Sequence, residues 1–131
     1  GGNKVYTAGS AIPASGPPIR VNISARYDFM LDRLPLYFVG DVGYQSKTPR
    51  SAASAFGAYN FDANLRADEA YTQTNVRLGL QFDKIDLSVF VTNLTDEAPL
   101  LGYNHTSITN PVYTAYTIQP RTAGLTLSYK Y

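Results

Sequence analysis

Hydrophobic and polar residues alternate along five segments of the chain. In the last segment, leucine or tyrosine occupies positions 125, 127, 129 and 131, while positions 124, 126, 128 and 130 are small or polar. A period of two places the apolar side chains on one face of a β-strand and the polar side chains on the other. The pattern predicts strands at about residues 19–30, 36–46, 71–82, 86–94 and 121–131.

The connections between these segments differ in length. Residues 31–34 and 83–86 predict tight turns, whereas residues 1–18, 46–70 and 94–118 are long, without clear period, and rich in small or polar residues and proline. Short turns at one end of the strands and long loops at the other are typical of outer-membrane β-barrels. We therefore expect an all-β chain, an antiparallel meander of about five long strands that forms part of a larger transmembrane β-barrel.

The two faces of the predicted strands agree with this interpretation. The apolar face is expected to carry, at the turn ends of the strands, Phe29, Phe38, Phe82, Tyr129 and Tyr131. Such a belt suits a membrane interface, where a ring can be buried while its edge stays hydrated. The polar face is expected to line a lumen with Arg20, Arg26, Asp28, Asp41, Gln73, Arg77, Gln81 and Lys130. A soluble β-sandwich also alternates, but its strands average only about five or six residues.

Composition narrows the possible functions. The 131 residues suffice for one domain, and only 16% of them are charged. The absence of cysteine excludes disulfides, zinc–thiolate sites and thiol catalysis, and the net charge of +1 gives no electrostatic reason to expect a nucleic-acid partner. The sequence contains no run of about 18 apolar residues, so no transmembrane helix is predicted. Because the sequence begins Gly1-Gly2-Asn3 without methionine, we expect it to be a piece of a longer protein.

Two short motifs precede the final strand. Asn-Leu-x-Asp stands at residues 93–96, and Pro-Arg-Thr-x-Gly stands at residues 120–124, ahead of a strand that ends on an aromatic residue. In this order they resemble the C-terminal end of TonB-dependent outer-membrane receptors. The motif positions are Asn93, Leu94, Asp96, Pro120, Arg121, Thr122, Gly124 and Tyr131. Members of that family often place an aromatic residue shortly after the first motif, whereas this chain continues with Glu97-Ala98-Pro99.

The resemblance implies a location, a function and a set of partners. A receptor of this family has a 22-stranded barrel with a plug in its lumen, so this chain would be a C-terminal segment that lacks the plug and the earlier strands. It would lie in the bacterial outer membrane and take part in the active uptake of a scarce nutrient such as a ferric siderophore, a cobalamin or an oligosaccharide. The implied partners are outer-membrane lipid, the plug and remaining strands, TonB through the missing N-terminal region, and the barrel assembly machinery through the C-terminal strand.

The long loops hold the candidate ligand-binding residues. Aromatic side chains on loops above a rigid scaffold often contact ligands, and here the candidates are Tyr59, Tyr103, His105, Tyr113 and Tyr116. His105 has no partner at metal-ligand or acid–base spacing, so the preferred interpretation is a solvated loop residue. We expect no catalytic site, no metal and no cofactor, and hence no enzyme. The alternative to a receptor fragment is a secreted β-sandwich that binds carbohydrate through its tyrosine-rich loops.

Overall fold

A computed structural model describes residues 17–48, 62–107 and 109–131, and these ranges form strands, turns and loops without a helix. The chain divides into two units. The sheet unit comprises residues 21–44, 72–98 and 118–131, and the loop unit comprises residues 1–20, 45–71 and 99–117. Within the described ranges, no helix is long and apolar enough to cross a membrane.

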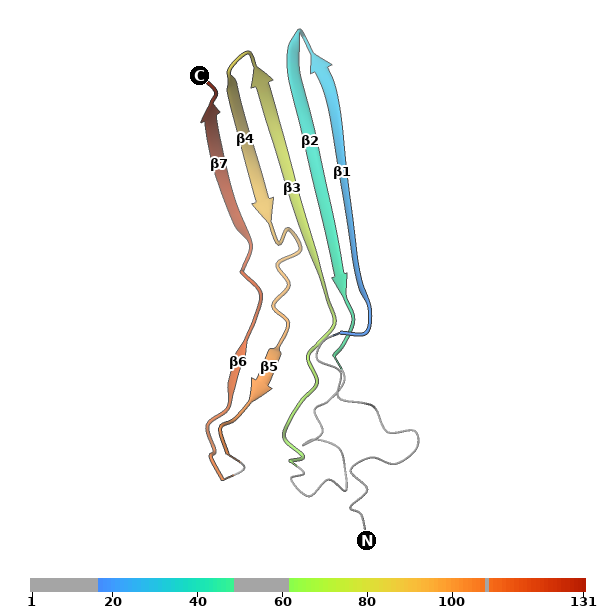
Figure 1. Cartoon of the computed structure of the whole chain (residues 1–131), viewed down its shortest axis with the longest axis vertical. Coiled ribbons are helices and arrows are strands. Elements are labelled where there is room, and N and C mark those ends of the chain that lie inside the picture. Colours follow the sequence, from blue (N-terminus) through green and yellow to red (C-terminus); the bar gives the residue numbers. More distant parts are fainter. Residues whose placement is uncertain (1–16, 49–61, 108) are drawn as a thin grey trace. The chain divides into compact units, whose positions relative to one another are not determined.

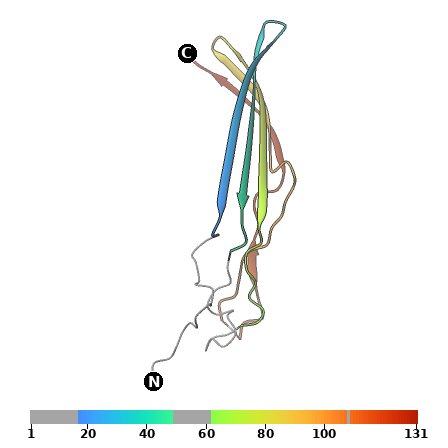
Figure 2. The same ribbon diagram turned by 90° about the vertical axis from the view of Figure 1, so that its right-hand side faces the viewer.

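Five long strands form one antiparallel sheet. They are β1 (Arg20–Leu31), β2 (Leu34–Gln45), β3 (Tyr71–Phe82), β4 (Ile85–Thr92) and β7 (Thr122–Tyr129). Their order in the sheet is β1-β2-β3-β4-β7 (Figure 1). In the side view the strands cross one another at an angle, which is the twist normal for a β-sheet (Figure 2). The predicted all-β meander of five long strands is therefore confirmed.

Both short connections are two-residue turns. Asp32 and Arg33 join β1 to β2 with φ angles of 48° and 74°, and Asp83 opens the β3–β4 turn with a φ of 49°. Positive φ at both central residues, as in the β1–β2 turn, characterises the type I′ turn, whose twist matches that of the flanking strands. In the β3–β4 turn only Asp83 has a positive φ. Aspartate tolerates this conformation better than most residues. The turns predicted at residues 31–34 and 83–86 are thus present.

The register of the sheet gathers apolar side chains into rows on one face. Leu78 of β3 pairs with Val89 of β4, which pairs with Leu125 of β7. In the next row on the same face, Leu87 of β4 pairs with Leu127 of β7. These side chains are exposed, with Leu125 at 66% and Leu127 at 67% of their full accessibility. The apolar face of the sheet therefore meets the surroundings of the unit instead of a second layer.

The polar face is packed around Tyr37. This residue of β2 is 5% exposed, and its ring lies over Gly79 of β3, where an added Cβ would be 2.1 Å from a ring carbon. The Tyr37 hydroxyl donates a hydrogen bond of 2.8 Å to Oδ1 of Asp86 on β4. On β1, the guanidinium of Arg26 lies 4.3 Å from the ring centroid and also pairs with Asp28 at 2.8 Å. Tyr37 therefore links four strands.

A second cluster extends this packing to β7. Arg77 Nη1 donates a 3.0 Å hydrogen bond to Oγ of Ser88, and its guanidinium lies 5.2 Å from the Phe90 ring centroid. The Phe90 ring in turn covers Gly124, its direct partner in β7. An aromatic ring over a cross-strand glycine covers backbone that the glycine leaves bare. Together the two clusters connect all five strands on the polar face.

Several sequence-based boundaries need correction, and the second strand, for example, begins at Leu34 instead of 36. The fourth strand ends at Thr92 instead of 94 because Asn93 takes a φ of 50°, which a strand cannot continue. The fifth strand ends at Tyr129, although the Lys130 N–H still donates to the Lys84 carbonyl at 2.8 Å. Residues 94–118 are not a plain loop, because they contain β5 (Leu101–Asn104) and β6 (Thr114–Tyr116), an antiparallel pair (Figure 1). An irregular register in β5 explains why no alternation marks it in the sequence.

Replacing Gly79 by alanine should destabilise the sheet by about 1–3 kcal/mol, because the new methyl group would displace the Tyr37 ring. Chemical unfolding of the full chain in detergent micelles measures this change. Gly40→Ala in β2 is the matched control, since its added Cβ approaches only the Phe38 side chain, at 3.3 Å. Equal stability of the two variants would contradict a structural role for the packing of Tyr37 on Gly79.

Candidate functional site

The two sequence motifs meet in the sheet unit around the side chain of Asn93. Asn93 is fully buried, and its Nδ2 donates to the carbonyls of Glu97 at 2.9 Å and Gln119 at 3.0 Å. Its Oδ1 accepts the Glu97 N–H at 3.0 Å. Both side-chain N–H groups and the carbonyl oxygen of the amide are therefore bonded, as a buried polar group requires.

The backbone of the first motif forms a tight turn directly after β4. Asn93 and Asp96 have φ angles of 50° and 57°, which Asn and Asp accept more readily than other side chains. The Asp96 N–H donates to the Asn93 carbonyl at 2.9 Å, and the Asn93 N–H donates to Oδ1 of Asn75 on β3 at 3.1 Å. The motif therefore places Asn and Asp at two positions of this turn that have positive φ angles.

Asp96 joins the first motif to the second. Its Oδ1 accepts the backbone N–H of Arg121 at 3.1 Å, and its Oδ2 lies 3.4 Å from Nη2 of the same arginine. Thr92 Oγ1 donates to the Thr122 carbonyl at 3.4 Å. We call the contacting residues Thr92, Asn93, Asp96, Gln119, Arg121 and Thr122 the motif junction. The junction lies where β4 ends and β7 begins, at the pair Thr92–Thr122, and thereby helps to set the register of the final strand.

The other motif positions are more peripheral. Leu94 is 41% exposed, Pro120 provides a carbonyl for Thr122 Oγ1, and Gly124 lies under Phe90. Tyr131 lies beyond the end of β7 and is fully exposed. Sequence reasoning missed Gln119 and Asn75, whose roles depend on contacts between segments distant in the sequence.

In the loop unit, His105 is not a solvated residue, so the sequence-based interpretation of its surroundings was wrong. Its side chain is 6% exposed, and Nε2 lies 2.6 Å from Oδ2 of Asp62, whose side chain is 7% exposed. Nδ1 lies 3.1 Å from the carbonyl oxygen of Asn110. Because both ring nitrogens face protein acceptors, the imidazole is not placed to act as a base on a substrate. Asp62 could not be identified as a partner, since it lies 43 positions before His105 in the sequence.

Three of the predicted ligand-binding residues form one aromatic cluster. The Tyr113 ring stacks on His105 at 4.7 Å and on Tyr103 at 4.9 Å, with interplanar angles of 13° and 5°. Tyr116 is 64% exposed and lies instead over Gly102, where an added Cβ would be 2.1 Å from its ring. Tyr59 lies outside the described residues. The guanidinium of Arg66, which the sequence analysis did not select, lies 5.8 Å from the Tyr103 ring centroid.

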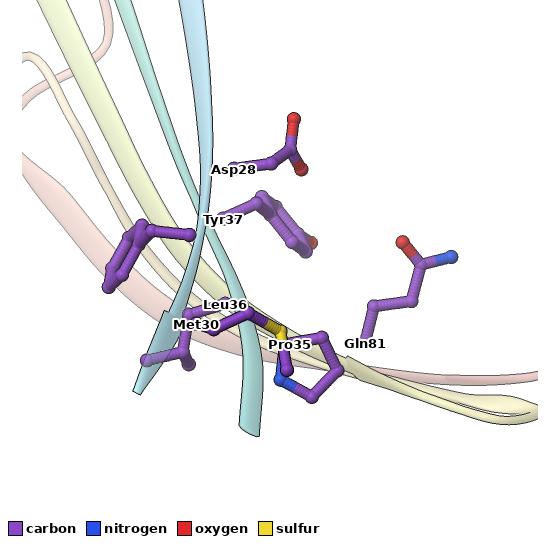
Figure 3. A pocket seen from close by; sticks show the side chains of 7 residues that line it. Asp28, Met30, Pro35, Leu36, Tyr37 and Gln81 are labelled. Carbon is purple, nitrogen blue, oxygen red and sulfur yellow. The ribbon is translucent and has the colours of Figure 1, made fainter. Parts of the chain in front are cut away.

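A hollow of about 310 Å³ lies near the β1–β2 turn (Figure 3). Its wall includes Met30, Pro35 and the ring of Tyr37, with the polar groups of Asp28 and Gln81 at its border. This volume is at the lower limit for small-molecule sites. The Asp28 carboxylate is already bonded to Arg26, and the Tyr37 hydroxyl is bonded to Asp86. The hollow therefore offers few polar contacts to a ligand.

Comparisons of the chain with protein-family models, with curated proteins and with solved structures found no match. Across the described ranges, no group of three or more His, Cys, Asp or Glu side chains is placed to hold a metal ion. The candidate sites are thus the motif junction of the sheet unit and the aromatic cluster of the loop unit, and both consist of this chain's own contacts.

Replacing Asn93 by aspartate should destabilise the sheet unit by about 2–4 kcal/mol, because a buried carboxylate would face the carbonyls of Glu97 and Gln119 without a donor. Hydrogen exchange of the β7 amides, together with unfolding in micelles, would detect the loss. Asn104→Asp is the control: Asn104 is exposed, and its oxygen accepts the His105 N–H, a bond that aspartate keeps. Unchanged exchange in the Asn93 variant would refute a role of the junction in holding β7.

Proposed function

We propose that this chain is the C-terminal part of the barrel of a TonB-dependent outer-membrane receptor that imports a scarce nutrient. The observation that carries the proposal is the exposed apolar face of the sheet. Val21 and Ile23 of β1, Val42 of β2, Leu78 of β3 and Val89 of β4 are between 42% and 64% exposed. Water-soluble monomers rarely expose apolar patches of this extent, whereas a barrel presents such a face to lipid.

The lengths of the three longest strands, β1, β2 and β3, also support a membrane wall. β1, β2 and β3 have 12 residues each, and β4 and β7 have eight. At roughly 3.3 Å per residue, the longer strands extend about 40 Å, and a tilted strand of about 9–11 residues spans the hydrocarbon core. The side chains of the opposite face bond to one another within the sheet, which suits a lumen wall.

The motif junction supports the resemblance to this receptor family. Its two motifs are about 25 residues apart in the sequence, yet Asn93 bonds to Gln119 and Asp96 bonds to Arg121. Under the proposal, the chain contributes wall and extracellular loops. The plug, the other strands and the segment that contacts TonB would belong to the rest of the receptor. The nutrient would be a siderophore, a cobalamin or an oligosaccharide.

The orientation of the sheet gives a direct test. In the parent receptor reconstituted in lipid, Leu127→Arg should cost about 2–4 kcal/mol of unfolding free energy, because it would place a charge against hydrocarbon. Its neighbour Thr126 lies on the opposite face, so Thr126→Arg should cost clearly less. Unfolding in lipid measures both. Equal costs would mean that the apolar face does not meet lipid, and the carbohydrate-binding sandwich would then become the better explanation.

Tyr131, the last residue, should matter for assembly if the barrel assembly machinery recognises the final strand. Deleting Tyr131 from the parent receptor should lower its level in the outer membrane several-fold but leave refolding in vitro nearly unchanged, because Tyr131 is fully exposed. Membrane fractionation and refolding assays measure the two effects. Deleting Leu127, which pairs with Leu87 within the sheet, should impair both. Normal membrane levels without Tyr131 would exclude a signal at this position.

A further inference from the structure

The loop unit carries an excess of positive charge. Its five cations are Lys4, Arg20, Lys47, Arg50 and Arg66, and its three carboxylates are Asp62, Asp68 and Glu69. All three carboxylates lie within the described ranges, and so do Arg20, Lys47 and Arg66. The unit therefore has two more cations than carboxylates, with its single histidine counted as neutral.

The carboxylates are also turned toward the unit's own groups. Asp62 is buried against His105, Asp68 Oδ1 accepts the Gly102 N–H at 2.7 Å, and Glu69 Oε2 accepts the Leu100 N–H at 2.8 Å. Two of the cations, Lys47 and Arg66, differ from these carboxylates in their contacts. The ion pairs among the described residues include neither Lys47 nor Arg66, and both side chains are exposed. Of the three carboxylates only Asp62 is buried, and Glu69 is exposed like the two cations, so this unit offers a dissolved partner a net positive charge that includes Lys47 and Arg66.

Arg66 stands at the end of a continuous series of contacts. Its guanidinium lies over Tyr103, Tyr103 stacks on Tyr113, and Tyr113 stacks on His105, which lies against the buried Asp62. A cation held over an aromatic ring keeps its charge and loses part of its freedom before any ligand arrives. The planar fork of a guanidinium can bind two oxygens of a carboxylate or phosphate at once.

A second cation lies in a neighbouring segment. The Thr48 N–H donates to the Asp68 carbonyl at 3.2 Å, which joins the segment of Lys47 to the segment that carries Arg66. An ammonium group adds attraction without a fixed geometry. We propose that the loop unit binds an oxyanion through Arg66, assisted by Lys47, and that the nutrient recognised is consequently a soluble anion. This inference rests on the proposed receptor function and names its ligand class.

The experiment uses the full chain in a neutral detergent at low salt, with citrate as the probe and calorimetry as the measurement. Arg66→Gln should weaken citrate binding by about tenfold, the effect of losing a charge-assisted hydrogen bond. Arg66→Lys should recover only part of the affinity, because the fork is lost. Arg33→Gln, in the β1–β2 turn of the sheet unit, removes the same charge and should change the affinity less than twofold.

Three outcomes would overturn the proposal. No measurable citrate binding by the unaltered chain would exclude the site, and equal weakening by Arg33→Gln and Arg66→Gln would leave only general charge attraction. The third outcome uses vesicles of phosphatidylcholine with and without phosphatidylglycerol. Arg66-dependent binding to the anionic vesicles without binding of citrate would assign the cation to lipid headgroups instead of a nutrient. The comparison of Leu127 with Thr126 tests the receptor function separately, so failure of either proposal is recognisable.

Discussion

The packing of aromatic rings on glycines holds the sheet together. Tyr37 can cross β3 to reach Asp86 only because Gly79 has no side chain, and Phe90 can lie against β7 only because Gly124 has none. These contacts bury ring surface and satisfy polar groups on a sheet whose opposite, apolar face is exposed among the described residues. Because the polar face is stabilised from within, the apolar face does not have to be covered by protein, and the proposal of a lipid-facing wall depends on this property.

In each unit, buried polar side chains join segments that are distant in the sequence, but the chemical groups differ between the two units. In the sheet unit, the neutral side-chain amide of Asn93 bonds to Glu97 and Gln119, while its backbone N–H bonds to the Asn75 side chain, and no charge has to be removed from water. In the loop unit, the Asp62 carboxylate and the His105 imidazole are buried together. This burial is favourable only when the contact between the two groups offsets the loss of their hydration. The first arrangement fixes the start of a strand, and the second supports a surface arginine.

The strands were predictable because a sheet with one apolar face imposes a period of two on the sequence, and both tight turns could be placed between strands. In the structure, individual strand ends differ from the predicted ends by up to two residues. At Thr92, for example, β4 ends because Asn93 adopts the left-handed conformation. The β5–β6 pair was missed because its irregular register removes the alternation. The burial of His105 and the position of Arg66 were also missed, since His105 contacts Asp62 and Arg66 contacts Tyr103, and the partners of each pair are far apart in the sequence.

The crossing of Tyr37 over Gly79 also limits how this protein can change during evolution. A side chain larger than hydrogen at position 79 would occupy the space of the ring, and a small residue at position 37 would leave the Asp86 carboxylate without the hydroxyl that bonds it. Neither position can drift alone without loss of stability. In descendants of this sequence, positions 37, 79 and 86 should therefore vary together, although they lie on three different strands, while the exposed leucines of the opposite face can exchange freely among apolar residues.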